Sequence, residues 1–195
     1  MFEREKFLIS SLKESSETKL KMIEECKADI FKASDAVKSS FQNGGKLMLC
    51  GNGGSAADCQ HIATEFIIRL SHDLTRPSLP AIALTTDTSN LTAGGNDIGF
   101  ENVFARSVEG LGKAGDVLIA VSTSGNSRNV LNAVKAARQN KIFTIGLLGG
   151  SGGIIKEHTD LNIIIPSANT QRIQEGHITA AHIICEIVER EMFGS

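Results

Sequence analysis

Apolar residues recur at helical spacing over the first 43 positions, which contain neither glycine nor proline. The apolar positions of this stretch are Phe7, Leu8, Leu12, Leu20, Met22, Ile23, Ile30, Phe31 and Val37. The spacing predicts one or two long helices, which the helix-stopping sequence Asn43-Gly44-Gly45 ends. These helices precede the rest of the chain as a separate layer.

Beyond this stop signal, short apolar runs alternate with helical patterns. Five runs predict buried strands, at Lys46–Cys50, Pro80–Leu84, Asp116–Val121, Ile142–Leu148 and Leu161–Ile165. Helices are predicted at 56–70, 100–111, 127–140 and 172–193. Such alternation predicts an α/β fold with a five-stranded, mostly parallel sheet flanked by helices. We expect one domain over 1–195, with 1–43 as an N-terminal helical layer and 44–195 as the sheet core and C-terminal helix.

Composition and charge narrow the class of protein. No apolar run approaches the roughly 20 residues of a membrane span, and the N-terminus lacks the apolar core of a secretory signal, so we expect a cytoplasmic protein. The formal net charge of -2 and the absence of Trp and Tyr argue against nucleic acid and anionic membrane as partners. The cysteines form no C-x-x-C pair and predict reduced, buried thiols, at Cys26, Cys50, Cys59 and Cys185.

A glycine-rich segment, Gly51-Asn-Gly-Gly-Ser55, follows the first predicted strand and leads into a helix. Glycines let a backbone approach a ligand, and a helix start offers N–H groups to an anion. The spacing is not the dinucleotide fingerprint, because Ala56 stands where its third glycine belongs, and the segment lacks the Gly-Lys-Ser/Thr of a P-loop. Taken alone, it fits a structural turn as well as a ligand loop.

A hydroxyl-rich segment, Ser122-Thr-Ser-Gly-Asn-Ser127, follows the third predicted strand and also enters a helix. Four hydroxyls and a glycine at a helix N-terminus favour a phosphate site that needs no lysine. Ser127 alone could be a simple N-cap, but this interpretation leaves three hydroxyls unexplained. We therefore predict that this loop binds phosphate.

Histidine and glutamate side chains lie near the same end of the predicted sheet. His61 and Glu65 are four residues apart and share one face of a predicted helix, where an exposed ion pair would also explain them. His182 lies on the last predicted helix, where a single histidine is usually packed or solvated, and we expect His72 and His158 to be solvated. Together with the hydroxyl loop, the His and Glu pattern favours proton transfer on a phosphorylated small molecule.

Several motifs occur together in a characteristic order. They are Cys50-Gly-Asn-Gly-Gly-Ser55, His61-x-x-x-Glu65, Arg76-Pro, Ala81-Ile-Ala-Leu84, Gly95-Asn-Asp97, Gly115-Asp-Val-Leu118, Ser122-Thr-Ser-Gly-Asn-Ser127, and Arg172-Ile-Gln-Glu175 with His182. Over nearly its whole length the chain thus resembles the phosphoheptose isomerases of the sugar isomerase (SIS) domain family. The resemblance implies a flavodoxin-like three-layer SIS fold. It also implies an aldose–ketose isomerase that converts sedoheptulose 7-phosphate to D-glycero-D-manno-heptose 7-phosphate, the first step of ADP-heptose and lipopolysaccharide core heptose synthesis.

The resemblance also implies roles for individual residues. Glu65 and His182 match the acid/base pair, with Glu65 as the base at carbon and His182 as the proton relay at the oxygens. The hydroxyl loop would hold the phosphate through Ser122, Thr123, Ser124 and Ser127. The sugar would contact Asn52, Gly53, Gly54, Ser55, Glu65, Asn96, Asp97 and Gln174. Zinc, one per subunit, would be held by His61, Glu65, Gln174 and His182.

The spacing of two implied zinc ligands bears on the assembly. Gln174 and His182 are eight residues apart, about 12 Å of helix rise, so one helix hardly brings both to one metal. We therefore expect them to come from two subunits of a homo-oligomer, a tetramer in the resembled family, with sites at its interfaces. Two positions qualify the match: Gln171 replaces an acid of some relatives, and Gly176 costs a helix about 1 kcal/mol relative to alanine unless something packs against it.

Two other function classes compete with the isomerase. Some relatives in the SIS family have lost isomerase chemistry and act as adaptors that bind the bacterial replication initiator, but both acid/base positions, Glu65 and His182, are filled here. A sugar-phosphate sensor without turnover is the third alternative, and no helix-turn-helix pattern accompanies the domain. The isomerase is therefore the function that the sequence favours.

Overall fold

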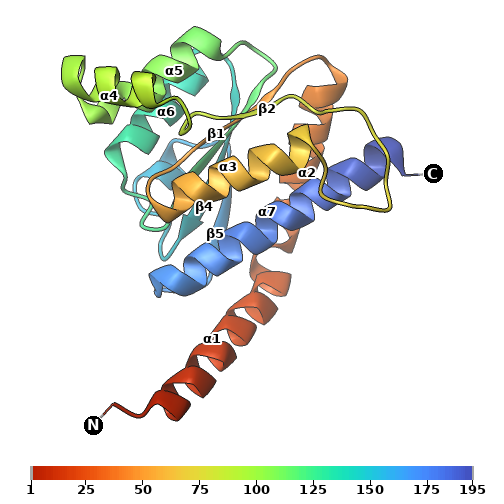
Figure 1. The fold of residues 1–195 in the computed structure, drawn as a ribbon, viewed down its shortest axis with the longest axis vertical. Helices are drawn as coiled ribbons and strands as arrows, with labels where there is room; N and C mark the ends of the chain where they lie inside the picture. The colour runs from red at the N-terminus through yellow and green to blue at the C-terminus, as the bar shows by residue number, and fades with distance from the viewer. Residues whose placement is uncertain (1, 195) are drawn as a thin grey trace.

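The structure is a computed structural model that describes residues 2–194. In this part of the chain five strands form one sheet in the order β2-β1-β3-β4-β5 (Figure 1). Their bounds are β1 Leu47–Cys50, β2 Ala81–Ala83, β3 Val117–Ser122, β4 Phe143–Gly149 and β5 Leu161–Ile165. All neighbouring pairs are parallel, which confirms the predicted α/β fold and extends "mostly parallel" to the whole sheet. The strand order is that of flavodoxin-like folds.

Helices connect the strands and cover both faces of the sheet (Figure 1). The α-helices are α1 Arg4–Glu25, α2 Lys27–Gln42, α3 Gly54–Ile67, α4 Thr88–Asp97, α5 Val103–Leu111, α6 Arg128–Gln139 and α7 Thr170–Phe193, with short 3-10 helices at Phe100–Asn102 and Ile155–Glu157. Within residues 2–194, no helix has the combination of length and apolarity that a bilayer crossing requires.

Two apolar clusters, one on each face of the sheet, hold these layers together. The first joins α2, α3 and α7 to inward side chains such as Leu49 and Ile119. The second joins α5 and α6 to the opposite face through Met48, Leu118 and their neighbours. Alternate residues of each buried strand serve the two clusters, as expected of a sheet covered on both sides. The prediction of buried thiols is confirmed: Cys26, Cys50, Cys59 and Cys185 are all buried and free.

Helix boundaries differ from the sequence predictions by a few residues. The helix predicted at 56–70 begins at Gly54 and ends at Ile67, and the one predicted at 172–193 begins at Thr170. Helix α4 was not predicted, because none of its residues is buried and it therefore carries no apolar stripe. Gly176 of α7 lies against Ile165 of β5, where a Cβ would come within 2.6 Å of Cγ2. Close packing thus explains a glycine inside this helix.

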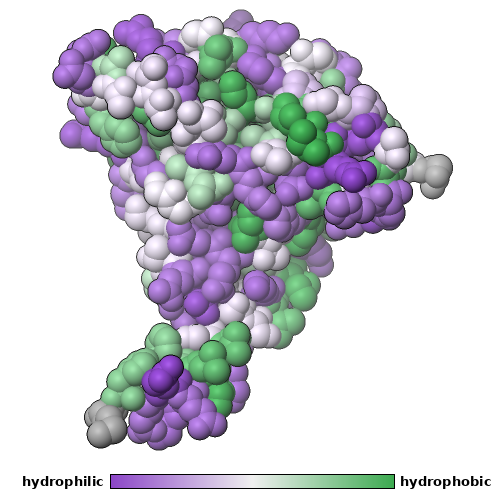
Figure 2. Space-filling model, in the orientation of Figure 1, coloured by the Kyte–Doolittle hydropathy of each residue, from purple (hydrophilic) through white to green (hydrophobic). Residues whose placement is uncertain are grey.

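Helix α1 projects from the body of the molecule (Figure 1). Among its residues only Thr18 and Met22 are buried. Large apolar side chains are exposed along it, including Phe7, Leu12 and Leu20. Green, hydrophobic surface is visible on the projecting helix (Figure 2). The predicted N-terminal helical layer therefore presents an apolar surface that this chain alone does not cover.

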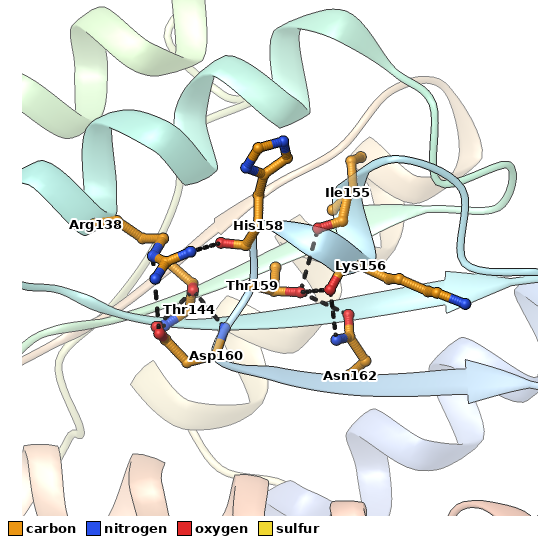
Figure 3. Close-up of polar contacts among 8 residues, drawn as sticks. All are labelled: Arg138, Thr144, Ile155, Lys156, His158, Thr159, Asp160 and Asn162. Atoms are coloured by element: carbon orange, nitrogen blue, oxygen red, sulfur yellow. Dashed lines mark hydrogen bonds and ion pairs between the residues drawn. The ribbon is translucent and has the colours of Figure 1, made fainter.

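A polar network fixes the entry to β5 (Figure 3). The Asp160 carboxylate accepts hydrogen bonds from the backbone N–H and hydroxyl of Thr144, at 2.9 and 2.7 Å. Arg138 of α6 donates to the carbonyl of His158, and its Nε lies 3.9 Å from Asp160. In the described part of the chain the His158 ring makes no hydrogen bond. The His158 side chain is half-buried, so the expectation that it is solvated is only partly met.

Candidate active site

The loops predicted to bind ligand both follow the carboxyl ends of neighbouring strands. The glycine turn follows β1 and the hydroxyl loop follows β3, and these two strands pair directly. In open parallel sheets, ligands bind at the carboxyl ends of the strands. The two loops therefore share one side of the molecule, and α3 and α6 start from it.

The hydroxyl loop has the features of an anion site. Ser122 is buried, and its hydroxyl lies 3.1 Å from that of Ser127, whereas Ser124 is exposed. Ser127 occupies the N-cap position of α6 but its side chain caps no N–H group, so capping does not account for it. Among the described residues, the backbone N–H groups of 127–129 have no hydrogen-bond acceptor. Free N–H groups at a helix start, next to hydroxyls, suit a phosphate.

A second glycine-rich loop, at residues 149–153, packs against the hydroxyl loop. Gly125 has φ +66°, and a Cβ at this position would overlap the backbone of Gly152. The N–H of Ile155 donates to the Gly125 carbonyl at 2.9 Å, and the N–H of Ile154 donates to the Asn126 side chain. The glycine cluster at 149–153 is thus explained by close backbone packing against the loop that is predicted to bind phosphate.

The glycine turn after β1 is fixed on two sides. Gly53 has φ +55° and is the N-cap of α3, and Ser55 is buried in the first turn. Asn52 contacts the buried Asn129 of α6, so the two loops are joined. A Cβ at Gly54 would overlap the side-chain amide of Gln174, which places that amide at the start of α3.

His61, Glu65 and His182 converge in one chain. One potential ligand atom from each lies within 4.8 Å of the other two. His61 Nε2 is 2.8 Å from His182 Nε2 and 3.4 Å from a Glu65 carboxylate oxygen. Helix α3 supplies His61 and Glu65 from one face and α7 supplies His182, so residues 121 positions apart meet as the resemblance implies. His61 is exposed and the other two are half-buried, which leaves the cluster open to ligands.

The donor set of this cluster fits a divalent metal such as zinc. His61 Nε2 and His182 Nε2 lie 2.8 Å apart, at hydrogen-bond distance, and the Glu65 carboxylate lies beside them. Nitrogen and oxygen donors of these types are usual zinc ligands. Gln174 of the same chain is not part of the cluster, because its amide contacts Gly54, seven residues and about 10 Å of helix rise before His61.

Asn96 and Asp97 lie at the C-terminal end of α4. Asn96 Nδ2 donates to Asp97 Oδ1 at 2.7 Å. Asp97 also lines an open groove between α4 and α5, together with Asn90 and Arg106. In residues 2–194 no hydrogen bond or ion pair connects either residue to the two ligand loops or to the His and Glu cluster.

Asp58 is a polar residue near the cluster that the sequence analysis missed. It lies on α3, three residues before His61, and desolvation by burial raises the pKa of its carboxyl while the charge of His61 opposes this. Its Oδ2 is buried and has no hydrogen-bond partner among the described residues. A carboxylate in a helix gives no sequence signal of partial burial, so only its place one turn before His61 could have suggested it.

A buried ion pair was also missed. Arg76, from the segment between α3 and β2, meets Glu189 of α7, with Nη2 2.6 Å from Oε1 and both side chains almost fully buried. The sequence does contain a signal for it. Glu189 follows Ala181 by eight and Cys185 by four residues, so it continues the buried stripe of α7. A carboxylate on such a stripe requires a buried cation.

Comparison with known proteins gives a consistent result. The SIS domain family matches residues 12–149. A phosphoheptose isomerase of Roseiflexus sp. (strain RS-1) is 52% identical over 188 residues, which are 96% of this chain and 94% of that protein. The structure of a phosphoheptose isomerase from Francisella tularensis matches with a TM-score of 0.93 at 35% identity, covering 97% of this chain and 100% of that chain. The corresponding enzyme of Neisseria gonorrhoeae gives 0.88 at 41% identity, with 94% and 97% covered.

Proposed function

Because the chain belongs to the phosphoheptose isomerases of the SIS domain family, we propose that it performs their reaction with Glu65 and His182 as its acid/base pair. The reaction is the isomerisation of sedoheptulose 7-phosphate for heptose synthesis. The observation that carries the assignment of the pair is the convergence of Glu65, His61 and His182 within 4.8 Å in one chain.

The chemistry needs two groups that move protons. Glu65 removes a proton from C1 of the ketose, which gives an enediol, and returns it to C2. His182 donates a proton to O2 and accepts the one that leaves O1, so no net proton is taken up or released. General acid–base catalysis of this kind contributes a factor of about 10² to 10⁴ in rate.

The remaining candidate residues hold the substrate. The hydroxyl loop binds the phosphate, and the free N–H groups at the start of α6 neutralise its charge. The phosphate-binding residues are Ser122, Thr123, Ser124 and Ser127. Those proposed along the sugar are Asn52, Gly53, Gly54, Ser55, Asn96, Asp97 and Gln174.

Zinc is the proposed cofactor, held by His61, Glu65 and His182 with Gln174 of a second subunit. A bound divalent ion polarises a carbonyl and stabilises negative charge that develops on its oxygen. The support from this chain is the donor chemistry of the cluster and the position of its own Gln174 over Gly54.

A homo-oligomer, by family a tetramer, would complete the site. Its support is the exposed apolar surface of α1, since monomeric proteins rarely expose large apolar patches. Subunit exchange tests the shared site. Glu65 and His182 meet within one chain. In a mixed oligomer of a Glu65 variant and a His182 variant, every site would therefore lack one of the two residues, and mixing would restore no activity. Mixing Glu65→Gln with Gln174→Ala chains should restore part of the activity, through sites that combine an intact Glu65 with the partner's intact Gln174.

Turnover of sedoheptulose 7-phosphate by the purified protein tests the proposed function. Product is measured with added zinc, without it and after chelation, in the wild type and in Glu65→Gln. We expect product in the wild type and a loss of at least 100-fold in Glu65→Gln, which changes side-chain volume little. Absence of product at every metal condition would favour the adaptor or sensor instead, and full activity in Glu65→Gln would refute the role of that residue.

A further inference from the structure

Arg76 is a buried cation with acceptors on several sides. Its Nε donates to Glu189 Oε1 at 2.7 Å, and the Arg76 side chain is 0% exposed. Its Nη1 donates to the carbonyls of Phe66 and Pro77, at 2.8 and 2.9 Å. Its Nη2 donates to the carbonyl of Glu65 at 2.7 Å. One planar guanidinium thus contacts a carboxylate of α7 and the backbone at the end of α3.

These contacts satisfy groups that a helix end leaves without partners. The last four carbonyls of an α-helix have no intrahelical N–H donor. Glu65 and Phe66 belong to the last turn of α3, and Arg76 supplies donors to both. On the other side, the Glu189 carboxylate accepts from the backbone N–H groups of Leu70 and Ser71, where the chain leaves α3. The ion pair therefore closes the C-terminal end of α3 onto α7.

The same two helices carry the proposed acid/base pair. One of the carbonyls that Arg76 contacts belongs to Glu65 itself. Glu189 follows His182 by seven residues, two turns along α7. We propose that Arg76 and Glu189 are a positioning pair for the isomerase reaction, which sets the distance between the Glu65 carboxylate and the His182 imidazole. This inference rests on the proposed function. In the proposed site, neither Arg76 nor Glu189 contacts the substrate.

Stability alone does not account for the arrangement. A buried ion pair is a weak source of stability, because desolvation of both charges offsets their attraction. Arg76 donates to the carbonyls of two adjacent residues, Glu65 and Phe66. Both hydrogen bonds require the end of α3 to lie at one position relative to the guanidinium. Lysine could not reproduce them, since its single ammonium lacks the planar fork that reaches a carboxylate and two carbonyls together. Misplacement of a catalytic group by about 1 Å can cost about 100-fold in rate.

Asp116 offers a matched control at the opposite, amino ends of the strands. Its carboxylate is also fully buried, pairs with Lys46 and accepts from the backbone N–H groups of Lys46 and Lys113. It lies just before β3, at the amino end of the strand, away from the loops that follow the carboxyl ends. Asp116→Asn therefore removes a comparable buried charge without touching α3 or α7.

The test compares Glu189→Gln, Arg76→Lys and Asp116→Asn in steady-state kinetics, thermal unfolding and amide hydrogen exchange. We expect all three to lower the unfolding temperature. Only Glu189→Gln and Arg76→Lys should lower kcat, by 10- to 100-fold with KM within twofold, and speed amide exchange over residues 65–71. Arg76→Lys keeps both charges, so it reports on the geometry even where Glu189→Gln folds poorly. Asp116→Asn should keep kcat within twofold of the wild type.

Other results overturn the inference. If kcat stays within twofold of the wild type in Arg76→Lys and Glu189→Gln while Glu65→Gln is inactive, the positioning pair alone is refuted. Equal losses of kcat in Glu189→Gln and Asp116→Asn would reduce the pair to a general contributor to stability. Full activity in Glu65→Gln refutes the assigned role of Glu65, and the positioning pair with it, whereas absence of product in the wild type refutes the proposed function.

Discussion

Asn52 and Asn129 exchange two amide hydrogen bonds, of 2.9 and 2.8 Å. Asn52 belongs to the glycine turn after β1, and the buried Asn129 to the first turn of α6, after the hydroxyl loop. The side-chain Oδ1 of Asn129 also accepts a hydrogen bond from the backbone N–H of Val130, at 3.0 Å. The pair holds the predicted sugar loop and the predicted phosphate loop in one fixed arrangement, and it directs the Asn52 amide toward α6.

Asn129→Ala should separate the two loops. The substitution removes both hydrogen bonds and leaves the partly buried Asn52 amide without a partner, at a cost of about 1 to 3 kcal/mol. Because both loops contact substrate in the proposed site, we expect KM for the sugar phosphate to rise about 10-fold. Asn132→Ala is the matched control, since Asn132 lies one turn later on α6 and bonds to Glu101. Equal KM values in the two variants would contradict the prediction.

Gly125→Ala should damage the hydroxyl loop. The position has φ +66°, and a Cβ there would overlap the Gly152 backbone. We therefore expect the free energy of unfolding to fall by about 1 to 3 kcal/mol. In contrast, Gly110 on α5 is exposed with open space around its Cα, and Gly110→Ala should stabilise by about 0.5 to 1 kcal/mol. Urea unfolding checks both values, and a Gly125→Ala protein as stable as the wild type would contradict the first.

Most of the fold could be predicted because its signals are local. The strands are short apolar runs, and all but the edge strand β2 are largely buried; β2 exposes Ile82, so the prediction of a buried strand there is wrong. The predicted bounds of 142–148 and 161–165 agree with β4 and β5 to within one residue. Helix α4 could not be predicted in this way, because its residues are all at least partly exposed and include Gly94 and Gly95. Without an apolar stripe, nothing in the sequence distinguishes such a helix from a loop.

The candidate site was predicted unevenly for a physical reason. The two loops have local signals, glycines and hydroxyls at the ends of strands. The meeting of His61 with His182 has none, since the residues are 121 positions apart, and it was predicted from the family resemblance. Arg76 and Asn129 were missed as supporting residues, because each acts through a partner that only the packing of helices on the sheet brings near.

Zinc should stabilise the wild type through the cluster on α3 and α7. A ligand at 100 times its dissociation constant adds about 2.7 kcal/mol to the free energy of unfolding. His61→Ala removes one donor and should abolish most of the zinc-dependent rise in unfolding temperature. His72→Ala is the control, because His72 is exposed in the loop after α3 and is outside the cluster. Equal zinc-dependent shifts in the two variants would exclude His61 as a ligand.

His177 should make the fold sensitive to mild acid. The residue is fully buried on α7, its Nε2 contacts the Leu148 carbonyl at 3.0 Å, and burial lowers its pKa from 6.5 to about 4. Between these values the unfolded chain binds a proton that the folded chain excludes. Stability is therefore complete above about pH 6.5 and is lost as the pH falls toward 4, by about 3 kcal/mol in all.

The measurement is the free energy of unfolding of the wild type, His177→Gln and His72→Gln at pH 7 and pH 5, at one protein concentration. His177→Gln removes the buried titrating group, whereas His72→Gln removes an exposed histidine. The wild type and His72→Gln should each lose about 2 kcal/mol more than His177→Gln over this interval, since 1.5 pH units lie in the window where only the unfolded chain is protonated. Equal losses in all three proteins would show that His177 is not excluded from protonation in the folded state.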